Sequence, residues 1–350
     1  MKNRLKQPSK NLKRIALFAA IFVFLFKFDA AAQRYFSSDA VGTTSGDFLN
    51  LDISPRAVAM GGAQTAVAED VSALHSNPAG LIQISRLSAM FMRAQYVSDI
   101  SYQYAAYAQR LSYDSVIAAS VLMTDIGSID NTDISGNKLG TFSPQDQVIT
   151  LGYSKGIIEF SDKDTDVSMG IAYKYIHSKI LDDARATAFD LGIMTYNFTY
   201  IPYRLSVLMQ NLGSGLKYDT ETVAIPLTFK IGASLNPFKN LMFATDFIMP
   251  KNNKAYFTLG SEVSTQTNEY TKFSVRGGIN SQKIRDKVGG FNFGLGMTLH
   301  FFSIDYAFVP MGDLGTTHRL SLSFDFPFRS QVFQRKSRSI YSKVTDIGTK

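Results

Sequence analysis

The stretch FNFGLGMTLHF, residues 291–301, carries the clearest fold signal in the chain, because large apolar residues alternate strictly with small or polar ones. One set is Phe291, Phe293, Leu295, Met297, Leu299 and Phe301, and the other is Asn292, Gly294, Gly296, Thr298 and His300. A period of two places the two sets on opposite faces of a β-strand. After a tight turn, residues 302–308 (FSIDYAF) continue the alternation in the opposite phase. We therefore predict a β-hairpin with one apolar face.

Similar runs of about ten residues follow one another along the chain, and about fourteen of them can be counted. They lie near residues 87–95, 101–109, 114–124, 146–155, 166–177, 187–196, 203–211, 227–236, 240–248, 255–263, 270–279, 291–299, 301–309 and 318–327. An even number of such segments is typical of an outer-membrane β-barrel. Closure of the sheet leaves no bare edge facing lipid. The sequence predicts an all-β fold, a transmembrane antiparallel barrel over residues 85–328.

A soluble β-sandwich or a solenoid also has alternating strands, and two features favour the barrel. The face opposite the apolar one mixes Gly, Ser, Thr and single charges, as a narrow lumen does, and is not uniformly charged. Connections also alternate in length, as expected when one end of a barrel carries long extracellular loops. We expect long loops near 125–145, 178–186, 212–226, 280–290 and 310–317, short turns near 237–239, 264–269 and 300, and an intermediate connection at 156–165.

Single charges on the face opposite the apolar one are the candidate lumen residues. They are Lys174, Asp190, Lys230, Asp246, Glu262, Arg276 and Asp305. Isolated charges in a narrow closed space need partners. We expect these side chains to pair across the lumen and to fill it.

The N-terminus has the layout of a secretory signal peptide over residues 1–32. A basic region precedes the apolar run 15–26, and three alanines at 30–32 predict cleavage before Gln33. The alternative is a retained anchor, although the apolar run is short for a spanning helix. Without this segment the formal charge falls from +7 to about +1, and a basic tail at 329–350 carries the remaining excess. This tail is interpreted as solvated, with binding of a partner or of anionic headgroups as the alternative.

No arrangement of catalytic or metal-binding residues stands out. The chain contains no cysteine, which excludes disulfides and thiolate metal sites. None of the four histidines, His75, His177, His300 and His318, has a second ligand at metal-binding spacing. The Asp- and Asn-rich stretch 124–137 could bind Ca²⁺, but such residues more often form turns. We expect no enzyme activity, no cofactor, no metal and no nucleic-acid partner.

Small residues dominate SPRAVAMGGAQTAVAEDVSALHSNPAG, residues 54–80. Ser54 and Pro55 predict the start of a short helix that Gly61 and Gly62 end. Asp70 predicts the cap of a second helix through Leu74, and Asn77-Pro78 predicts a turn that ends at Gly80. Helices this short and this poor in large apolar residues cannot form a core of their own. We expect residues 33–84 to form a plug inside the lumen.

The stretch FLNLDISPRAVAMGGAQTAVAEDVSALHSNPAGL, residues 48–81, resembles the N-terminal signature of the PorV/PorQ family of outer-membrane proteins, within the FadL-like group. The matching residues are Arg56, Met60, Gly61, Gly62, Ala63, Ala68, Asp70, Ala73, Leu74, Asn77, Pro78, Ala79 and Gly80. Residues 101–111, 210–219 and 305–324 also resemble the family. The resemblance implies a FadL-like barrel of fourteen strands with an internal plug.

The resemblance also implies a role in type IX protein secretion in the outer membrane of Bacteroidota. In that role, loops 124–146, 212–226 and 310–317 would contact secreted cargo, the translocon or the sortase-containing attachment complex. One alternative is a FadL-like channel for hydrophobic molecules, whose lateral opening could lie at Pro202, Pro226 or Pro237. A second alternative is an enzyme acting on outer-membrane lipid, for which no nucleophile and base can be named.

Overall fold

The computed structural model describes residues 35–97, 100–159, 165–197, 201–218 and 220–326, and within them fourteen strands form one closed antiparallel barrel. The barrel strands are β1 (Leu87–Gln95), β2 (Ser101–Ser112), β3 (Ser115–Asp125), β6 (Gln145–Glu159), β7 (Thr165–Lys179), β8 (Asp183–Asn197), β9 (Tyr203–Gly213), β12 (Thr228–Phe238), β13 (Leu241–Pro250), β14 (Tyr256–Asn268), β15 (Thr271–Asn280), β16 (Phe291–Leu299), β17 (Phe302–Pro310) and β18 (Thr316–Phe326). Strand β1 pairs with β2 and with β18, which closes the sheet. The predicted fold class is confirmed, and each predicted run overlaps one barrel strand.

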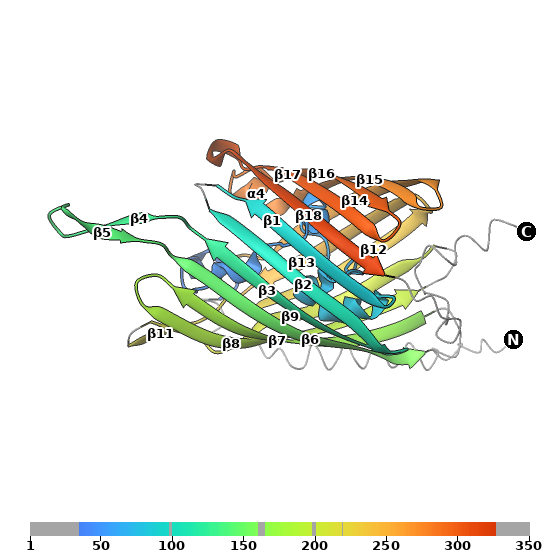
Figure 1. Ribbon diagram of the computed structural model, residues 1–350, viewed down its shortest axis with the longest axis horizontal. Coiled ribbons are helices and arrows are strands. Elements are labelled where there is room, and N and C mark those ends of the chain that lie inside the picture. The colour runs from blue at the N-terminus through green and yellow to red at the C-terminus, as the bar shows by residue number, and fades with distance from the viewer. Residues whose placement is uncertain (1–34, 98–99, 160–164, 198–200, 219, 327–350) are drawn as a thin grey trace, which may run out of the picture.

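The remaining elements lie in loops or before the first barrel strand (Figure 1). The loop elements are the hairpin β4 (Ile129–Thr132) and β5 (Lys138–Phe142), the hairpin β10 (Leu216–Tyr218) and β11 (Glu221–Val223), helix α4 (Ser281–Arg285) and η5 (Gly312–Leu314). Before the barrel come η2 (Ser38–Ala40), η3 (Asp47–Asn50), α2 (Pro55–Ala59), α3 (Ala73–Ser76) and η4 (Pro78–Gln83). Among the described residues, no helix combines the length and apolar character needed to cross a membrane.

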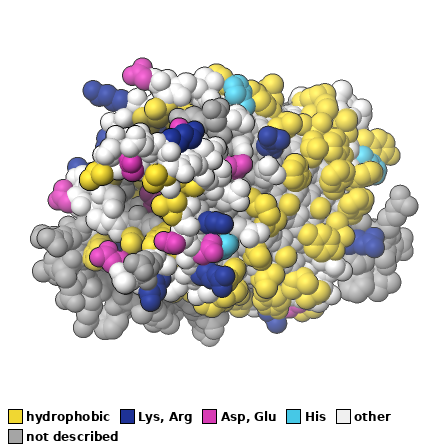
Figure 2. All heavy atoms as spheres, turned by 60° about the vertical axis from the view of Figure 1, so that its left-hand side comes forward, with side chains coloured by type: hydrophobic (Ala, Val, Ile, Leu, Met, Phe, Trp, Pro, Cys, Tyr) yellow, Lys and Arg dark blue, Asp and Glu magenta, His cyan; other side chains and the backbone are white. Residues whose placement is uncertain are grey.

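Side chains alternate between the outer surface and the lumen along each barrel strand. On β16, Phe291, Phe293 and Leu295 are 55–58% exposed, whereas the intervening Asn292 is 2% exposed. The exposed members form an apolar surface over the barrel wall (Figure 2). Apolar side chains gain by leaving water, so this outer surface is suited to lipid.

The two ends of the barrel differ in the length of their connections. Residues 126–144, 214–227 and 281–290 connect strands at one end, while two-residue turns such as 113–114 and 239–240 connect them at the other. Bacterial barrels place long loops outside the cell and short turns in the periplasm, so we call the long-loop end the outer end. The long loop predicted near 178–186 is only three residues (180–182), because β7 and β8 extend beyond their predicted limits.

The N-terminal segment runs through the barrel from the outer end to the short-turn end. At the outer end, the Phe36 amide donates to the Lys251 carbonyl and the Ser45 amide to the Ala224 carbonyl, both at 2.9 Å. At the other end, Arg110 donates to the Ile84 carbonyl at 2.8 Å and to the carbonyl of Tyr113 in the β2–β3 turn at 2.7 Å. We call residues 35–50 the outer strap and residues 54–83 the luminal segment. The predicted signal peptide and basic tail lie outside the described residues.

The path of this segment predicts a defined labelling pattern in cells. Val41 in the outer strap and Tyr113 in the β2–β3 turn are equally exposed, at 61% each, but lie at opposite ends of the barrel. Because the chain has no cysteine, Val41→Cys and Tyr113→Cys each introduce a single thiol. We expect a membrane-impermeant maleimide to label Val41→Cys on intact cells and Tyr113→Cys only after lysis. The reverse pattern would contradict this orientation.

Candidate functional site: the luminal segment and its seat

The first helix of the luminal segment begins and ends as its sequence predicts. Helix α2 follows Ser54 and begins at Pro55, and the backbone turns sharply at Gly61 and Gly62, whose φ angles are 73° and 97°. Positive φ angles suit glycine, which lacks a Cβ. The side chain of Ser54 makes no capping hydrogen bond, and its carbonyl accepts from the Val58 amide at 3.0 Å instead.

The second helix starts later than predicted. Helix α3 begins at Ala73 and its N-cap residue is Ser72, so Asp70 does not cap it and the helix does not end at Leu74. The Asp70 carboxylate accepts from the Ser72 amide at 2.8 Å and also from the Ser72 hydroxyl. Asp70 therefore orders the turn before the helix, because its side chain reaches the backbone two residues on.

Asn77 joins the turn after helix α3 to the middle of the luminal segment. Its side-chain amide donates to the Thr65 carbonyl at 2.8 Å, and its side-chain oxygen accepts from the Ala79 amide at 3.1 Å. The predicted turn continues as helix η4 through Gln83. A Cβ on Gly80 would lie 2.3 Å from the Ala68 carbonyl oxygen, so this position requires glycine.

Seven glycines of the barrel wall form a seat for the luminal segment. At each of them an added Cβ would lie less than 3.0 Å from an atom of that segment; they are Gly152, Gly170, Gly192, Gly232, Gly260, Gly278 and Gly294. Real Cβ atoms essentially never make contacts this close. The missing side chains therefore let the segment pack directly on the wall.

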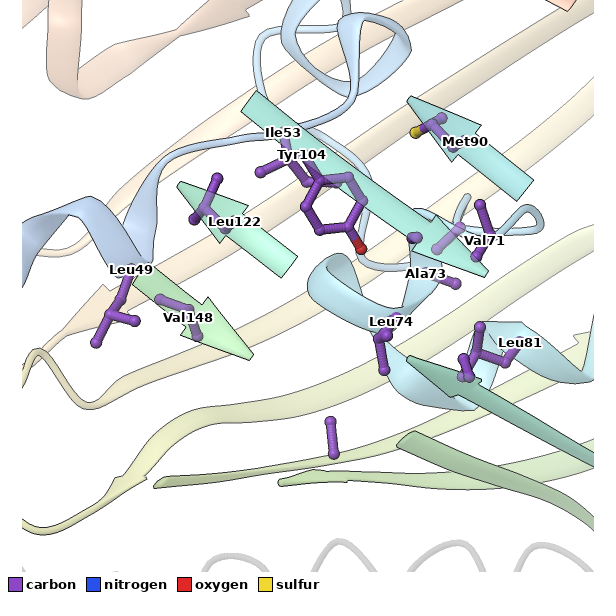
Figure 3. Packing of buried hydrophobic residues seen from close by; sticks show 14 of the residues in the cluster. Leu49, Ile53, Val71, Ala73, Leu74, Leu81, Met90, Tyr104, Leu122 and Val148 are labelled. Atoms are coloured by element: carbon purple, nitrogen blue, oxygen red, sulfur yellow. The ribbon is translucent and has the colours of Figure 1, made fainter. Parts of the chain in front are cut away.

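The seat has two main parts, far apart around the barrel. Gly152, Gly170 and Gly192 lie on β6, β7 and β8, where they contact Leu74 and the Asn77–Ala79 turn. Gly260, Gly278 and Gly294 lie on β14, β15 and β16, where they contact residues 59–61. The luminal segment thus spans the lumen, and Figure 3 shows Leu74 and Leu81 packed among the strands.

Arg56 joins the luminal segment to the wall through ion pairs. Its guanidinium donates to both oxygens of Glu262 on β14, at 2.8 and 3.1 Å, and to Glu69 at 2.8 Å. Glu69 also accepts from Arg204 on β9 at 2.8 Å. On the wall, Glu262 accepts from Arg276 at 2.6 Å. The side chains of Arg56 and Glu262 are only 11% and 1% exposed, so this network is shielded from water.

The network continues from Arg276 to Asp305 on β17, whose side chain is 16% exposed. Three guanidiniums and three carboxylates are thereby linked across the lumen. Such a balanced and hydrogen-bonded arrangement offsets the cost of burying charge.

The other predicted lumen charges lie outside this network. Lys174 pairs with Asp190 at 2.7 Å and donates to Asn211 at 2.8 Å, where a bulge interrupts the pairing of β8 with β9. Asp246 accepts from the amide and hydroxyl of Thr65, at 2.8 and 2.6 Å. Lys230 lies half-buried on the lumen face of β12. All seven predicted charges thus occur on lumen-facing positions, but they do not form one cluster.

Glu69 and Arg204 take part in the network although the sequence did not single them out. Arg204 alternates with outward-facing Tyr203 and Leu205, which is the same signal that marked the other lumen charges. Glu69 lies in the luminal segment, outside any alternating run, so no periodic signal marks it.

Burial and nearby charge shift two titratable groups of the luminal segment. Burial alone would raise the pKa of Glu69, but the guanidiniums of Arg56 and Arg204 outweigh it and lower that pKa to about 2. Burial, with Lys174 and Lys230 nearby, lowers the pKa of His75 to about 3. At neutral pH the segment therefore holds an ionised Glu69 and an uncharged His75.

These shifts predict that mild acid loosens the luminal segment. A released His75 titrates near 6.5, so the released form binds more protons and seating weakens as pH falls from about 6.5 toward 3. The contribution of Glu69 is lost only as pH falls below about 4.5 toward 2. We expect the difference in thermal midpoint between the wild type and His75→Asn to change between pH 7 and pH 5, with the wild type losing more stability than the variant. The control is His177→Asn, on the outer end of β7, whose difference from the wild type should not change in this way. A difference between the wild type and His75→Asn that stays constant with pH would contradict this assignment.

No cluster of three or more His, Asp or Glu side chains placed to hold a metal ion occurs in the described part of the chain. In the Asp-rich stretch 124–137, the Asp133 carboxylate accepts from the amides of Ser135 and Asn137 at 2.9 and 2.8 Å. These bonds form the turn of the β4–β5 hairpin, which extends beyond the outer end of the barrel (Figure 1).

Comparison with solved structures identifies the class of barrel. The toluene transporter TbuX of Ralstonia pickettii superimposes with a TM-score of 0.53 and 11% identity, over 79% of this chain and 99% of that chain. The toluene transporter TodX of Pseudomonas putida superimposes with a TM-score of 0.51 and 10% identity, over 79% and 99%. A FadL homologue of Pseudomonas aeruginosa gives a TM-score of 0.47 and 10% identity, over 78% and 98%.

The chain therefore shares the fold of the two toluene transporters, which in its described residues is a closed antiparallel barrel of fourteen strands preceded by a helical segment. No family model matches the sequence, and no curated protein matches it. The resemblance to the PorV/PorQ family accordingly stays a prediction.

Proposed function

We propose that this protein is an outer-membrane channel for small apolar molecules. The observation that carries the proposal is the architecture shared with two toluene transporters, which covers nearly the whole length of both. The lumen is occupied by the luminal segment, so passage requires part of the N-terminal segment to move.

The outer strap is the part whose displacement costs least. Apart from Ala40 and Leu49, which are buried, its residues are exposed or half-buried. It is also held by hydrogen bonds at the surface, such as those from the Asn252 side chain to Thr44 at 2.7 Å and to Asp47 at 3.0 Å. The luminal segment is held by buried ion pairs and by the glycine seat. Weakly buried segments open at lower free energy than buried ones. We propose that opening begins at the strap.

Locking the strap tests this proposal. Thr44→Cys with Asn252→Cys places the only two thiols of the chain on hydrogen-bonded neighbours, where a short thiol cross-linker can join them. In cells whose uptake of labelled toluene or long-chain fatty acid depends on this barrel, cross-linking should lower uptake to the level of cells without it. Thr44→Cys alone is the control, and reductive removal of the cross-link should restore uptake. Unchanged uptake in the locked barrel would overturn the proposal.

A second candidate is a component of type IX protein secretion in Bacteroidota. It is supported by the resemblance of residues 48–81 to the PorV/PorQ family, and within that stretch Arg56, Gly61 and Asn77 hold the contacts of the luminal segment. The β4–β5 hairpin adds a candidate surface for cargo, translocon or attachment-complex proteins, with Ile134 and Leu139 fully or largely exposed.

Affinity capture from native membranes separates the two candidates. A secretion component should co-purify with translocon or sortase proteins, and deletion of residues 129–142 should abolish that recovery while leaving the barrel folded. Recovery of the barrel alone, with loss of hydrophobic uptake on gene deletion, favours the channel and excludes the secretion role.

A further inference from the structure

Three exposed cations gather on one side of the outer end. Lys254 follows β13, and Arg285 and Lys287 lie in and just after α4; all three are exposed to solvent. We call these residues the basic rim. The loops that carry them are in contact, since Arg285 donates to the Asn253 side chain at 3.4 Å. Lys251 lies beside them but is engaged over the ring of Tyr35, 4.3 Å from its centroid.

Three acidic residues lie near the basic rim. Arg285 pairs with Asp286 at 3.2 Å, Asp47 of the outer strap accepts from the Asn252 side chain at 3.0 Å, and Asp313 lies in the neighbouring loop at 311–315. The Arg285–Asp286 pair is solvent-exposed, with side chains 37% and 42% accessible, so it holds Arg285 only weakly.

The other side of the outer end has the opposite character. Asp125 at the end of β3 and Asp130 and Asp133 in the β3–β6 connection lie on that side with Lys138, which pairs with Asp130 at 2.6 Å. Charge at the outer end is therefore unevenly distributed around the barrel, with the exposed Lys254 and Lys287 beside the Arg285–Asp286 pair on one side and a majority of carboxylates on the other. Charges of both signs lie toward the loop end in Figure 2.

The basic rim lies at the outer ends of strands β14 and β16. Lys254 precedes the outward-facing Phe257 by three residues, and Lys287 precedes the outward-facing Phe291 by four. Long basic side chains can reach lipid headgroups while their stems stay near apolar groups. Ile284 and Leu314, which are 43% and 55% exposed, add apolar side chains in the same group of loops.

We propose that the basic rim binds the phosphate groups of anionic lipid in the outer leaflet. The cations and the adjoining apolar side chains together match a phosphorylated lipid that stands beside the wall at β14–β16. Clustered Lys and Arg near a membrane surface are attracted to anionic headgroups, and each contributes separately. The barrel would thus carry an ordered lipid on one side, beside β14–β16.

The test compares lipid retention by the folded full-length barrel. The barrel is incorporated into phosphatidylcholine nanodiscs that contain bis-phosphorylated lipid A, extracted in mild detergent, and examined by native mass spectrometry. The variant Lys254→Gln/Arg285→Gln/Lys287→Gln should weaken lipid A binding on the order of 100-fold. The control Lys138→Gln/Lys179→Gln/Arg185→Gln removes the same charge from the other side and should leave binding unchanged. Heat-modifiable gel migration confirms that each variant is folded.

Two further arms separate phosphate recognition from other causes. Dephosphorylated lipid A should not be retained, whereas Lys254→Arg/Lys287→Arg should retain bis-phosphorylated lipid A like the wild type. Equal retention of the dephosphorylated lipid would show binding by the apolar surface alone and would overturn the proposal. Equal loss in the control variant would show a general charge effect and would overturn it as well.

Discussion

Replacing Gly278 by valine is expected to unseat the luminal segment while the barrel itself stays closed. A Cβ at this position would lie 2.0 Å from the carbonyl carbon of Met60 and 2.2 Å from the Gly61 nitrogen. Both atoms belong to the backbone of the luminal segment, so no rotation of a side chain can relieve the overlap. Valine is favourable in a strand, and the barrel pairing of β15 with β14 and β16 can persist.

Overpacking of a core costs about 1–3 kcal/mol, and a backbone collision lies at the upper end of that range or above it. We therefore expect Gly278→Val to lower the stability of the seated form by about 3 kcal/mol or more. In planar bilayers the variant should show a larger open probability, and proteases should cleave its luminal segment. The matched control is Gly277→Val, one residue away, where an added Cβ meets no atom within 4 Å. Equal stability and conductance in the two variants would show that the glycine seat does not hold the segment.

Removing the carboxylate of Glu262 is expected to have an effect of similar size through a different cause. Glu262 accepts hydrogen bonds from Arg56 and Arg276, and its own side chain is 1% exposed. Glu262→Ala leaves both guanidiniums in a buried position without this partner. Breaking a buried ion pair in this way costs about 3–5 kcal/mol. We expect a corresponding loss in the free energy of unfolding, measured with denaturant.

Two variants show whether charge is responsible for this loss. Glu262→Gln keeps the size of the side chain and removes its charge, and it should retain most of the destabilisation. Asp130→Ala breaks the exposed pair with Lys138, whose side chains are 59% and 57% accessible, and should cost less than about 1 kcal/mol. A loss for Glu262→Gln as small as that for Asp130→Ala would contradict a structural role for the buried network.

The barrel strands could be predicted because each of their side chains faces either lipid or the lumen. Apolar residues therefore alternate with small or polar ones along each strand. Alternation marked β16 and β17 residue by residue, and it also placed Glu262 and Arg276 on the inner face. The exceptions occur where a strand continues beyond the apolar surface. Strands β7 and β8 extend toward the outer end with Lys179, Asp183 and other polar residues, so their pattern resembles a loop.

Within the luminal segment, local signals marked the turns better than the helix limits. Helix α2 begins at Pro55, the backbone turns at Gly61, and a turn follows Asn77, each as the sequence predicts. These positions could be predicted because each of the three residues has a conformational preference of its own. Asp70 bonds to Ser72 and does not cap the helix, since several residues in that stretch can accept a backbone hydrogen bond and the packing selects among them.

The pattern of residue types along the chain thus specifies the strands, the apolar outer face, the lumen charges and a segment of unusually small residues. These features depend on the surroundings of one residue or on bonds between near neighbours. The pairing of Arg56 with Glu262, the match of Gly278 to Met60 and the path of the strap from the outer end depend on closure of the barrel. Closure brings together residues some two hundred positions apart, and no periodicity in the sequence encodes which of them will meet across the lumen.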